Sequence, residues 1–134
     1  MKISTVIIDD EHTSVELLKQ LLLKTPHVAV VGTADSVDTG VNLIDQTRPD
    51  LVFLDINMPE MNGWECLSML KSNPLTKNIP VLIYSTSSHP RDRQIAAELG
   101  ASGFITKPSD YKTLHRTLSA IASGLYSDIK KYHV

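Results

Sequence analysis

The chain has 134 residues, of which 13 are Lys or Arg and 15 are Asp or Glu, so its formal net charge is −2 at pH 7. This balance gives no electrostatic reason to expect direct binding to nucleic acid or to an acidic membrane surface. With 42% apolar and 21% charged residues, the composition is globular, and this length favours one compact core. No apolar segment approaches the about 20 residues that cross a bilayer, so we expect no membrane insertion.

Cys66 is the only cysteine of the chain, which excludes an intrachain disulfide and a cysteine zinc site and agrees with a reducing compartment. The apolar segment at residues 3–8 is cut short by three acidic residues, and no small-residue cleavage site follows. A secretory signal peptide therefore does not fit. These features lead us to expect a cytoplasmic protein.

Short β-branched segments alternate with longer amphipathic segments, and this change of period is typical of repeated βα units. The expected strands and helices are, in chain order, Ile3–Asp9 and Ser14–Leu23, Val28–Thr33 and Val37–Thr47, Leu51–Asp55 and Trp64–Ser72, Val81–Ser85 and Asp92–Leu99, and Gly103–Thr106 and Lys112–Ala122. The strands are nearly continuous apolar runs, which favours a parallel sheet with helices on both faces. The sequence therefore predicts a doubly wound α/β fold with five parallel strands.

Residues that end or begin secondary structure fall between the predicted elements. Pro49 and Pro80 stand just before strands, Gly100 follows a helix, and Ser36 and Ser109 are suitable helix N-caps. The boundaries drawn from the apolar pattern and those drawn from turn and cap residues thus agree.

Polar residues stand where the predicted strands end. The first strand ends in Asp9-Asp10, the third in Asp55, the fourth in Ser85 and the fifth in Lys107. The carboxyl ends of parallel strands meet at one edge of the sheet, where α/β proteins bind ligands. Three carboxylates repel there unless a cation compensates, and Mg²⁺ is the expected ion. Beside it, Asp55 suits a nucleophile that accepts a phosphoryl group.

Residues 52–63, VFLDINMPEMNG, resemble the phosphoacceptor segment of the receiver domains of two-component response regulators. Residues 8–11, IDDE, resemble the acidic pair of that family, residues 80–85 its fourth strand, and residues 100–108 its lysine followed by proline. Order and spacing agree over residues 3–124, which chance matches of short motifs do not explain.

The resemblance implies a single-domain, chemotaxis-regulator-like receiver with a flavodoxin-like sheet of order 2-1-3-4-5. Residues 1–125 would form the receiver domain and residues 126–134 a short C-terminal extension. The implied function is that of a phosphorelay protein which takes a phosphoryl group from a histidine kinase or histidine phosphotransfer protein. Its chemistry would be limited to its own phosphorylation and autodephosphorylation, so it is not expected to be a turnover enzyme.

The resemblance also assigns roles around the metal, position by position. Asp55 would be the phosphoacceptor and a ligand of Mg²⁺. Asp10 would bind Mg²⁺ directly and Asp9 largely through water. Asn57 would contribute its backbone carbonyl, a role that depends on position more than on the side chain.

Four further positions carry family roles by the same resemblance. Lys107 would bind the phosphoryl oxygens, and Pro108 would follow a cis peptide bond, which proline adopts at small cost. Ser85 would be the switch hydroxyl, where the family more often has Thr. Phe104 stands at the place of the switch aromatic, which is Tyr or Phe in the family.

Taken singly, these residues have plainer interpretations. Asp9 and Asp10 suit a loop start and a helix cap, Lys107 suits a solvated charge, and Phe104 suits a core position. Asn57 favours a turn, but a turn does not require an acidic residue directly after an apolar strand. We favour the functional interpretation because all of these residues occur together.

Two other functions share parts of this pattern. A flavodoxin-like FMN electron carrier could cradle phosphate at residues 85–88, but its phosphate loop is expected after the first strand, where Asp9, Asp10 and Glu11 would repel an anion. Visible absorbance of the protein would decide this point.

Aspartate-nucleophile phosphatases carry an Asp-x-Asp motif, and in this sequence Asn57 stands at the position of the second acid. No Gly-x-x-x-x-Gly-Lys loop is present, so a nucleotide is not the expected phosphoryl donor.

The output of such a domain has to act through a surface. Movement of Ser85 and Phe104 would affect the fifth strand and its flanking helices, roughly Arg91–Leu99 and Lys112–Ala122. We expect this surface to bind an unknown downstream protein or to form a homodimer. The charged residues expected on it are Arg91, Arg93, Lys112 and Arg116.

Overall fold

The computed structural model describes residues 2–57, 63–107 and 111–132 of the chain. Within these residues five strands and five helices alternate. The strands are β1 (Ile3–Ile8), β2 (Val28–Ala34), β3 (Leu51–Leu54), β4 (Val81–Ser85) and β5 (Gly103–Thr106). The helices are α1 (His12–Leu23), α2 (Val37–Thr47), α3 (Gly63–Ser72), α4 (Pro90–Glu98) and α5 (Tyr111–Tyr132).

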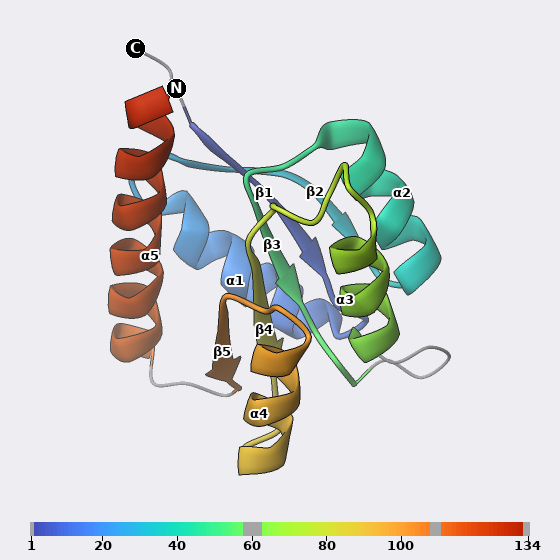
Figure 1. Cartoon of the computed structure of the whole chain (residues 1–134). Helices are drawn as coiled ribbons and strands as arrows, with labels where there is room; N and C mark the ends of the chain where they lie inside the picture. Colours follow the sequence, from blue (N-terminus) through green and yellow to red (C-terminus); the bar gives the residue numbers. More distant parts are fainter. Residues whose placement is uncertain (1, 58–62, 108–110, 133–134) are drawn as a thin grey trace.

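All neighbouring strands are parallel, and their order in the sheet is β2-β1-β3-β4-β5. The predicted doubly wound fold of order 2-1-3-4-5 is therefore confirmed. Helices α1 and α5 cover one face of the sheet, and α2, α3 and α4 cover the other (Figure 1). Among the described residues, no helix is both long and apolar enough to span a membrane.

Two apolar clusters fill the space between the sheet and its helices. The α1–α5 core contains Ile7, Val15, Leu18, Phe53, Leu82, Tyr84, Leu114 and Leu118 among others, and the α2–α4 core contains Val6, Ile8, Ile44, Leu54, Leu67, Ile83 and Ala96 among others. Successive strand residues alternate between the two cores because side chains of a strand point to opposite faces. Strand β3 is buried on both faces, which is why its sequence is apolar throughout.

The predicted boundaries lie close to the observed ones for most elements. Ser36 is the N-cap of α2, and its side chain accepts the N–H of Thr39. Gly100 follows α4 with a φ of 97°, a conformation that glycine adopts without steric cost. Helix α4 begins at Pro90, two positions before the predicted start, because proline fits the first helical turn. The predicted cap Ser109 lies outside the described residues.

Helix α5 ends at Tyr132 and not at the predicted Ala122. Ile121 and Leu125 pack against the α1–α5 core, so the apolar stripe of this helix continues past the predicted end. The helix therefore enters residues 126–134, and the domain boundary after residue 125 stays a prediction.

Gly63 begins α3 directly beside the end of β3, and its backbone N–H donates to the carbonyl of Ile56 at 3.0 Å. A Cβ at this position would lie 2.5 Å from the carbonyl oxygen of Asp55 and 2.5 Å from the Cα of Ile56. These are backbone atoms, so the loop after β3 would have to move. We expect Gly63→Ala to lower the free energy of unfolding by roughly 1–3 kcal/mol in urea unfolding.

Gly124→Ala is the matched control, because a Cβ at Gly124 meets nothing within 4 Å. Removing glycine from the interior of α5 should raise the free energy of unfolding by up to about 1 kcal/mol. Equal stabilisation by both substitutions would show that the close approach at Gly63 is not a constraint.

Candidate functional site

The predicted site residues meet at the carboxyl edge of the sheet, and the backbone fixes them there. The N–H of Asp9 donates to the carbonyl of Ala34 at 2.9 Å, and the N–H of Asp55 donates to the carbonyl of Ile8 at 2.9 Å. The N–H of Lys107 donates to the carbonyl of Ser85 at 2.6 Å. The hydrogen-bond ladder thus runs into the functional residues themselves, so their positions follow from the strand register.

Lys107 is buried, with 5% of its surface exposed. Its Nζ lies 2.5 Å from Oδ2 of Asp9, 3.8 Å from Oδ2 of Asp55 and 3.9 Å from Oε2 of Glu11. The same ammonium lies 5.1 Å from the centroid of the Tyr84 ring. A buried ammonium is tolerated because the facing carboxylates compensate its charge. The prediction that Lys107 lies beside Asp55 is confirmed by this geometry, whereas its burial was not expected.

Asp9, Asp10 and Asp55 each place one carboxylate oxygen within 4.8 Å of the others. Such a set of oxygen ligands fits a hard divalent cation that keeps several waters. Asp9 accepts the N–H of Glu11 on Oδ1 at 2.8 Å and binds Lys107 through Oδ2. Both oxygens of Asp9 are thus engaged, which fits contact with a cation through water, while Asp10 is exposed at the rim of the cluster.

Burial raises the pKa of the Asp55 carboxyl from its ordinary 3.8 to about 6, and the charge of Asp9 acts in the same direction. The backbone N–H of Asn57, 3.1 Å from Oδ1, and the ammonium of Lys107 favour the ionised form and limit the rise. Asp55 is therefore ionised at neutral pH, but its buried charge lowers the free energy of unfolding. A cation bound to the cluster would reduce this loss of stability.

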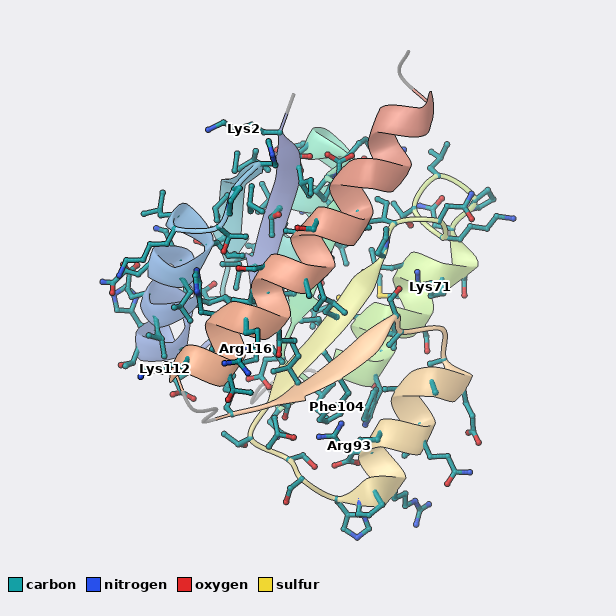
Figure 2. All side chains as sticks on the ribbon, turned by 90° about the vertical axis from the view of Figure 1, so that its left-hand side faces the viewer. Lys2, Lys71, Arg93, Phe104, Lys112 and Arg116 are labelled. Atoms are coloured by element: carbon teal, nitrogen blue, oxygen red, sulfur yellow. The ribbon has the colours of Figure 1, made fainter. Side chains whose placement is uncertain are left out.

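Ser85 is fully buried, and its Oγ accepts two hydrogen bonds, from Nδ2 of Asn57 at 3.1 Å and from the N–H of Ser87 at 3.3 Å. A hydroxyl has two acceptor sites and one hydrogen, so the hydrogen of Ser85 is left to donate. Phe104 is half-buried on β5 and packs against the α2–α4 core, where Figure 2 shows it facing α4. The predicted switch residues thus lie on neighbouring strands, with Ile83 opposite Phe104 in the register.

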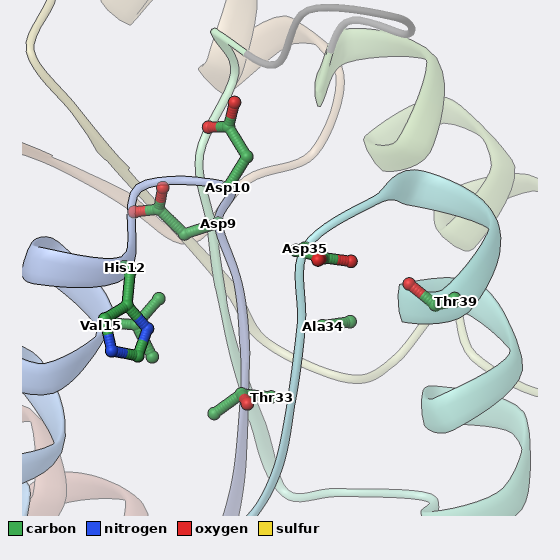
Figure 3. Close-up of a pocket in the computed structure, with 8 residues that line it drawn as sticks. All are labelled: Asp9, Asp10, His12, Val15, Thr33, Ala34, Asp35 and Thr39. Carbon is green, nitrogen blue, oxygen red and sulfur yellow. The ribbon is translucent and has the colours of Figure 1, made fainter.

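A cavity of about 410 Å³ lies beside the acidic cluster, between the ends of β1 and β2. Figure 3 shows Asp10 on the turn after β1, and Asp35 and Thr39 near the start of α2. The residues that line this cavity are Asp9, Asp10, His12, Val15, Thr33, Ala34, Asp35 and Thr39. The cavity leaves the acidic edge accessible from the side of β2.

Three contacts of the site were not predicted from the sequence. The side-chain amide of Asn57 bonds Ser85, although the position was expected to act through its backbone. Tyr84 and Glu11 both approach Lys107. The contact of Tyr84 could have been inferred from its position directly before Ser85 in a buried strand, because strand alternation turns Tyr84 to the face opposite that of Ser85. Pro108 lies outside the described residues.

The sequence model of the family described as "Response regulator receiver domain" matches residues 5–119. The chain belongs to this family. Receiver domains are signalling domains that are phosphorylated by histidine kinases or phosphotransfer proteins and bind Mg²⁺ at an acidic pocket. The match supports neither an FMN electron carrier nor an aspartate-nucleophile phosphatase.

Individual proteins agree with the family match. The chain is 34% identical to the nitrate/nitrite response regulator NarL of Escherichia coli over 90% of its own length and 56% of NarL. It is 34% identical to PilH of Pseudomonas aeruginosa over 89% of its own length and 97% of PilH. The chain thus spans about half the length of NarL and nearly all of PilH.

Solved structures show the same fold. The phosphorylated cyanobacterial phytochrome response regulator RcpA superimposes with a TM-score of 0.81 at 25% sequence identity, over 96% of each chain. The flavodoxin-like receiver fold predicted from the sequence is therefore confirmed.

Asp55→Asn should stabilise the metal-free receiver domain at pH 7, because it removes a buried ionised carboxylate. The Asp55 pKa is about 6 in the folded chain and about 3.8 in the unfolded chain. The ionised carboxylate of Asp55 therefore lowers the free energy of unfolding at pH values above about 6, and this loss disappears as the pH falls from about 6 toward 3.8. We expect a gain on the order of 1–3 kcal/mol at pH 7 that vanishes toward pH 3.8, measured by urea unfolding with chelator.

The control is Asp35→Asn, which makes the same charge change at an exposed position of the same edge. Its effect should stay within about 0.5 kcal/mol at both pH values. A loss of stability in Asp55→Asn at pH 7 would contradict the conclusion that burial disfavours the ionised carboxylate of Asp55.

Proposed function

We propose that Asp55 is the phosphoacceptor of this receiver, and that Asp10, Asp9, Asp55 and the backbone carbonyl of Asn57 hold Mg²⁺ around it. The observation that carries the proposal is the buried ammonium of Lys107, 3.8 Å from Oδ2 of Asp55, within a cluster of acids. A purely structural ion pair would need one carboxylate. The additional acids leave negative charge that a divalent cation can compensate.

In the proposed reaction, a carboxylate oxygen of Asp55 forms a bond to the phosphorus of a phosphohistidine. The bond from phosphorus to the imidazole nitrogen breaks, and its electron pair stays on that nitrogen. When bound, Mg²⁺ would neutralise part of the charge on the transferring oxygens. Lys107, whose ammonium lies 3.8 Å from Oδ2 of Asp55, supplies a second positive charge, and the N–H of Asn57 holds Oδ1 of Asp55 in place.

The donor is a histidine kinase or a histidine phosphotransfer protein, and the output is a change of the surface formed by α4, β5 and α5. The phosphoryl group brings up to about two negative charges and three acceptor oxygens. The free hydrogen of Ser85 can turn to one of them, and Phe104 then rearranges beside it. This surface would bind a downstream protein or a second copy of the chain.

Phosphorylation is tested by intact-mass measurement after incubation with phosphoramidate and Mg²⁺. The unchanged chain should gain the mass of one phosphoryl group, because Asp55 is ionised at neutral pH and faces Lys107. Asp55→Asn should gain none, and excess chelator should suppress the reaction. An adduct that forms equally well on Asp55→Asn would place the phosphoacceptor elsewhere.

Lys107→Met tests whether the acid cluster needs a cation. Removing the ammonium leaves Asp9 and Asp55 buried without their partner, so the metal-free variant should lose roughly 3 kcal/mol of stability. Mg²⁺ should then raise the melting temperature of the variant more than that of the unchanged chain, because the cation replaces the positive charge that the substitution removes.

The control for this experiment is Lys19→Met, which breaks an exposed pair with Glu16 at 3.7 Å. Its stability and its response to Mg²⁺ should match those of the unchanged chain. If Mg²⁺ stabilises Lys107→Met no more than it stabilises this control, the cluster is not the metal site.

A further inference from the structure

Arg93 connects α4 to the edge strand β5 through three contacts of one side chain. Its guanidinium carbon lies 4.8 Å from the centroid of the Phe104 ring. One terminal nitrogen donates to the carbonyl of Phe104 at 3.3 Å, and the other donates to Oγ1 of Thr106 at 2.8 Å. Figure 2 shows Arg93 and Phe104 side by side between β5 and α4. The planar guanidinium is suited to such a combination of stacking and hydrogen bonding.

These contacts matter because α4 has little apolar attachment to the sheet. The structure describes every residue of α4, and Ala96 is the buried one among them. Ile95 is half-buried. With so little buried apolar surface, polar contacts such as those of Arg93 make up a large share of what holds this helix against β5.

Thr106 links Arg93 to the loop that follows Ser85. Oγ1 of Thr106 accepts from Arg93 and donates to the carbonyl of Ser87 at 3.2 Å. The N–H of Ser87 donates to Oγ of Ser85, and the hydroxyl of Ser87 bonds the carboxylate of Asp92. Ser85 and Thr106 are also partners in the register of β4 and β5. A continuous chain of hydrogen bonds therefore runs from Ser85 to Arg93.

The far end of this chain is the phosphoacceptor loop. Oγ of Ser85 also accepts from Nδ2 of Asn57, whose N–H binds Asp55. If the hydroxyl of Ser85 turns toward a new acceptor on Asp55, its alignment with the N–H of Ser87 changes. The contacts of Ser87, Thr106 and Arg93 then have to adjust together, because each shares an atom or a residue with the next.

We propose that Arg93 is a positioning residue of the switch, which clamps Phe104 and Thr106 against α4 in the unphosphorylated protein. The proposal rests on phosphorylation of Asp55 as proposed above. The clamp stabilises the unphosphorylated arrangement, so its removal shifts the equilibrium toward the phosphorylated one. A ligand that favours the phosphorylated arrangement must then bind more tightly.

The test uses Arg93→Ala and, as the matched control, Gln94→Ala. Gln94 is an exposed, long polar residue of the same helix that bonds Glu98 within α4. The first measurement is hydrogen exchange of the unphosphorylated proteins. Arg93→Ala should speed exchange at Gly103–Thr106 and at Ser87, and Gln94→Ala should not. This result does not depend on phosphorylation.

The second measurement is the affinity for beryllofluoride with Mg²⁺, a mimic of an aspartyl phosphate. Arg93→Ala should bind about three- to tenfold more tightly than the unchanged chain, because it removes one cation–π contact and two charged hydrogen bonds, all of them made by an exposed side chain. Thr106→Val, which keeps the shape and removes Oγ1, should act in the same direction. The double variant should bind no more tightly than Arg93→Ala alone, because both residues belong to one network.

Equal affinity of Arg93→Ala, Gln94→Ala and the unchanged chain, or weaker binding by Arg93→Ala, would overturn the clamp. Unchanged exchange at β5 in Arg93→Ala would do so as well. If the unchanged chain binds no beryllofluoride and gains no phosphoryl group, the proposed function fails, and the exchange measurement still decides whether Arg93 holds β5. The two failures are thus distinguishable.

Discussion

The ion cluster around Lys107 is the constraint on which the rest of the structure depends. An ammonium that is 5% exposed is tolerated only beside compensating carboxylates, and Asp9 and Asp55 are at least as buried. The three residues directly follow β5, β1 and β3, so their pairing links the ends of three strands at one point of the edge. With Asp10 the cluster carries more negative than positive charge. This excess of negative charge fits a bound cation, and it lowers the free energy of unfolding of the cation-free protein.

Much of this edge was predictable because it follows from the backbone. Parallel strands end on the same side, so Asp9, Asp55 and Lys107 had to meet once the five strands were located. The apolar runs located the strands, since a sheet covered on both faces needs buried residues throughout. The burial of Lys107 was not predictable in the same way. Lys107 also contacts the ring of Tyr84 on β4, and such a contact between side chains of different elements leaves no pattern in the sequence.

The prediction was weakest where contacts between distant side chains decide the structure. Helix α5 was expected to end at Ala122, because the residues after it are more polar, yet packing of Leu125 continues the helix. Periodicity located α4 but gave no account of what attaches it to the sheet. The attachment runs through Arg93 and Thr106, and a hydrogen-bond partner on a neighbouring strand leaves no periodic signal in the sequence.

The alternation of strand residues divides the site between the two faces of the sheet. Asp9, Asp55 and Lys107 continue the parity of Ile7, Phe53 and Ile105, which face the α1–α5 core, whereas Ser85 and Phe104 share the parity of residues in the α2–α4 core. Asp55 and the packing of α4 therefore lie on opposite faces of the sheet. Among the described residues, Asn57 and Ser85 bridge the sheet edge by a side-chain hydrogen bond. If Asp55 is phosphorylated as proposed, this hydrogen bond is the direct contact in the described part of the chain through which the new charge would alter packing on the other face.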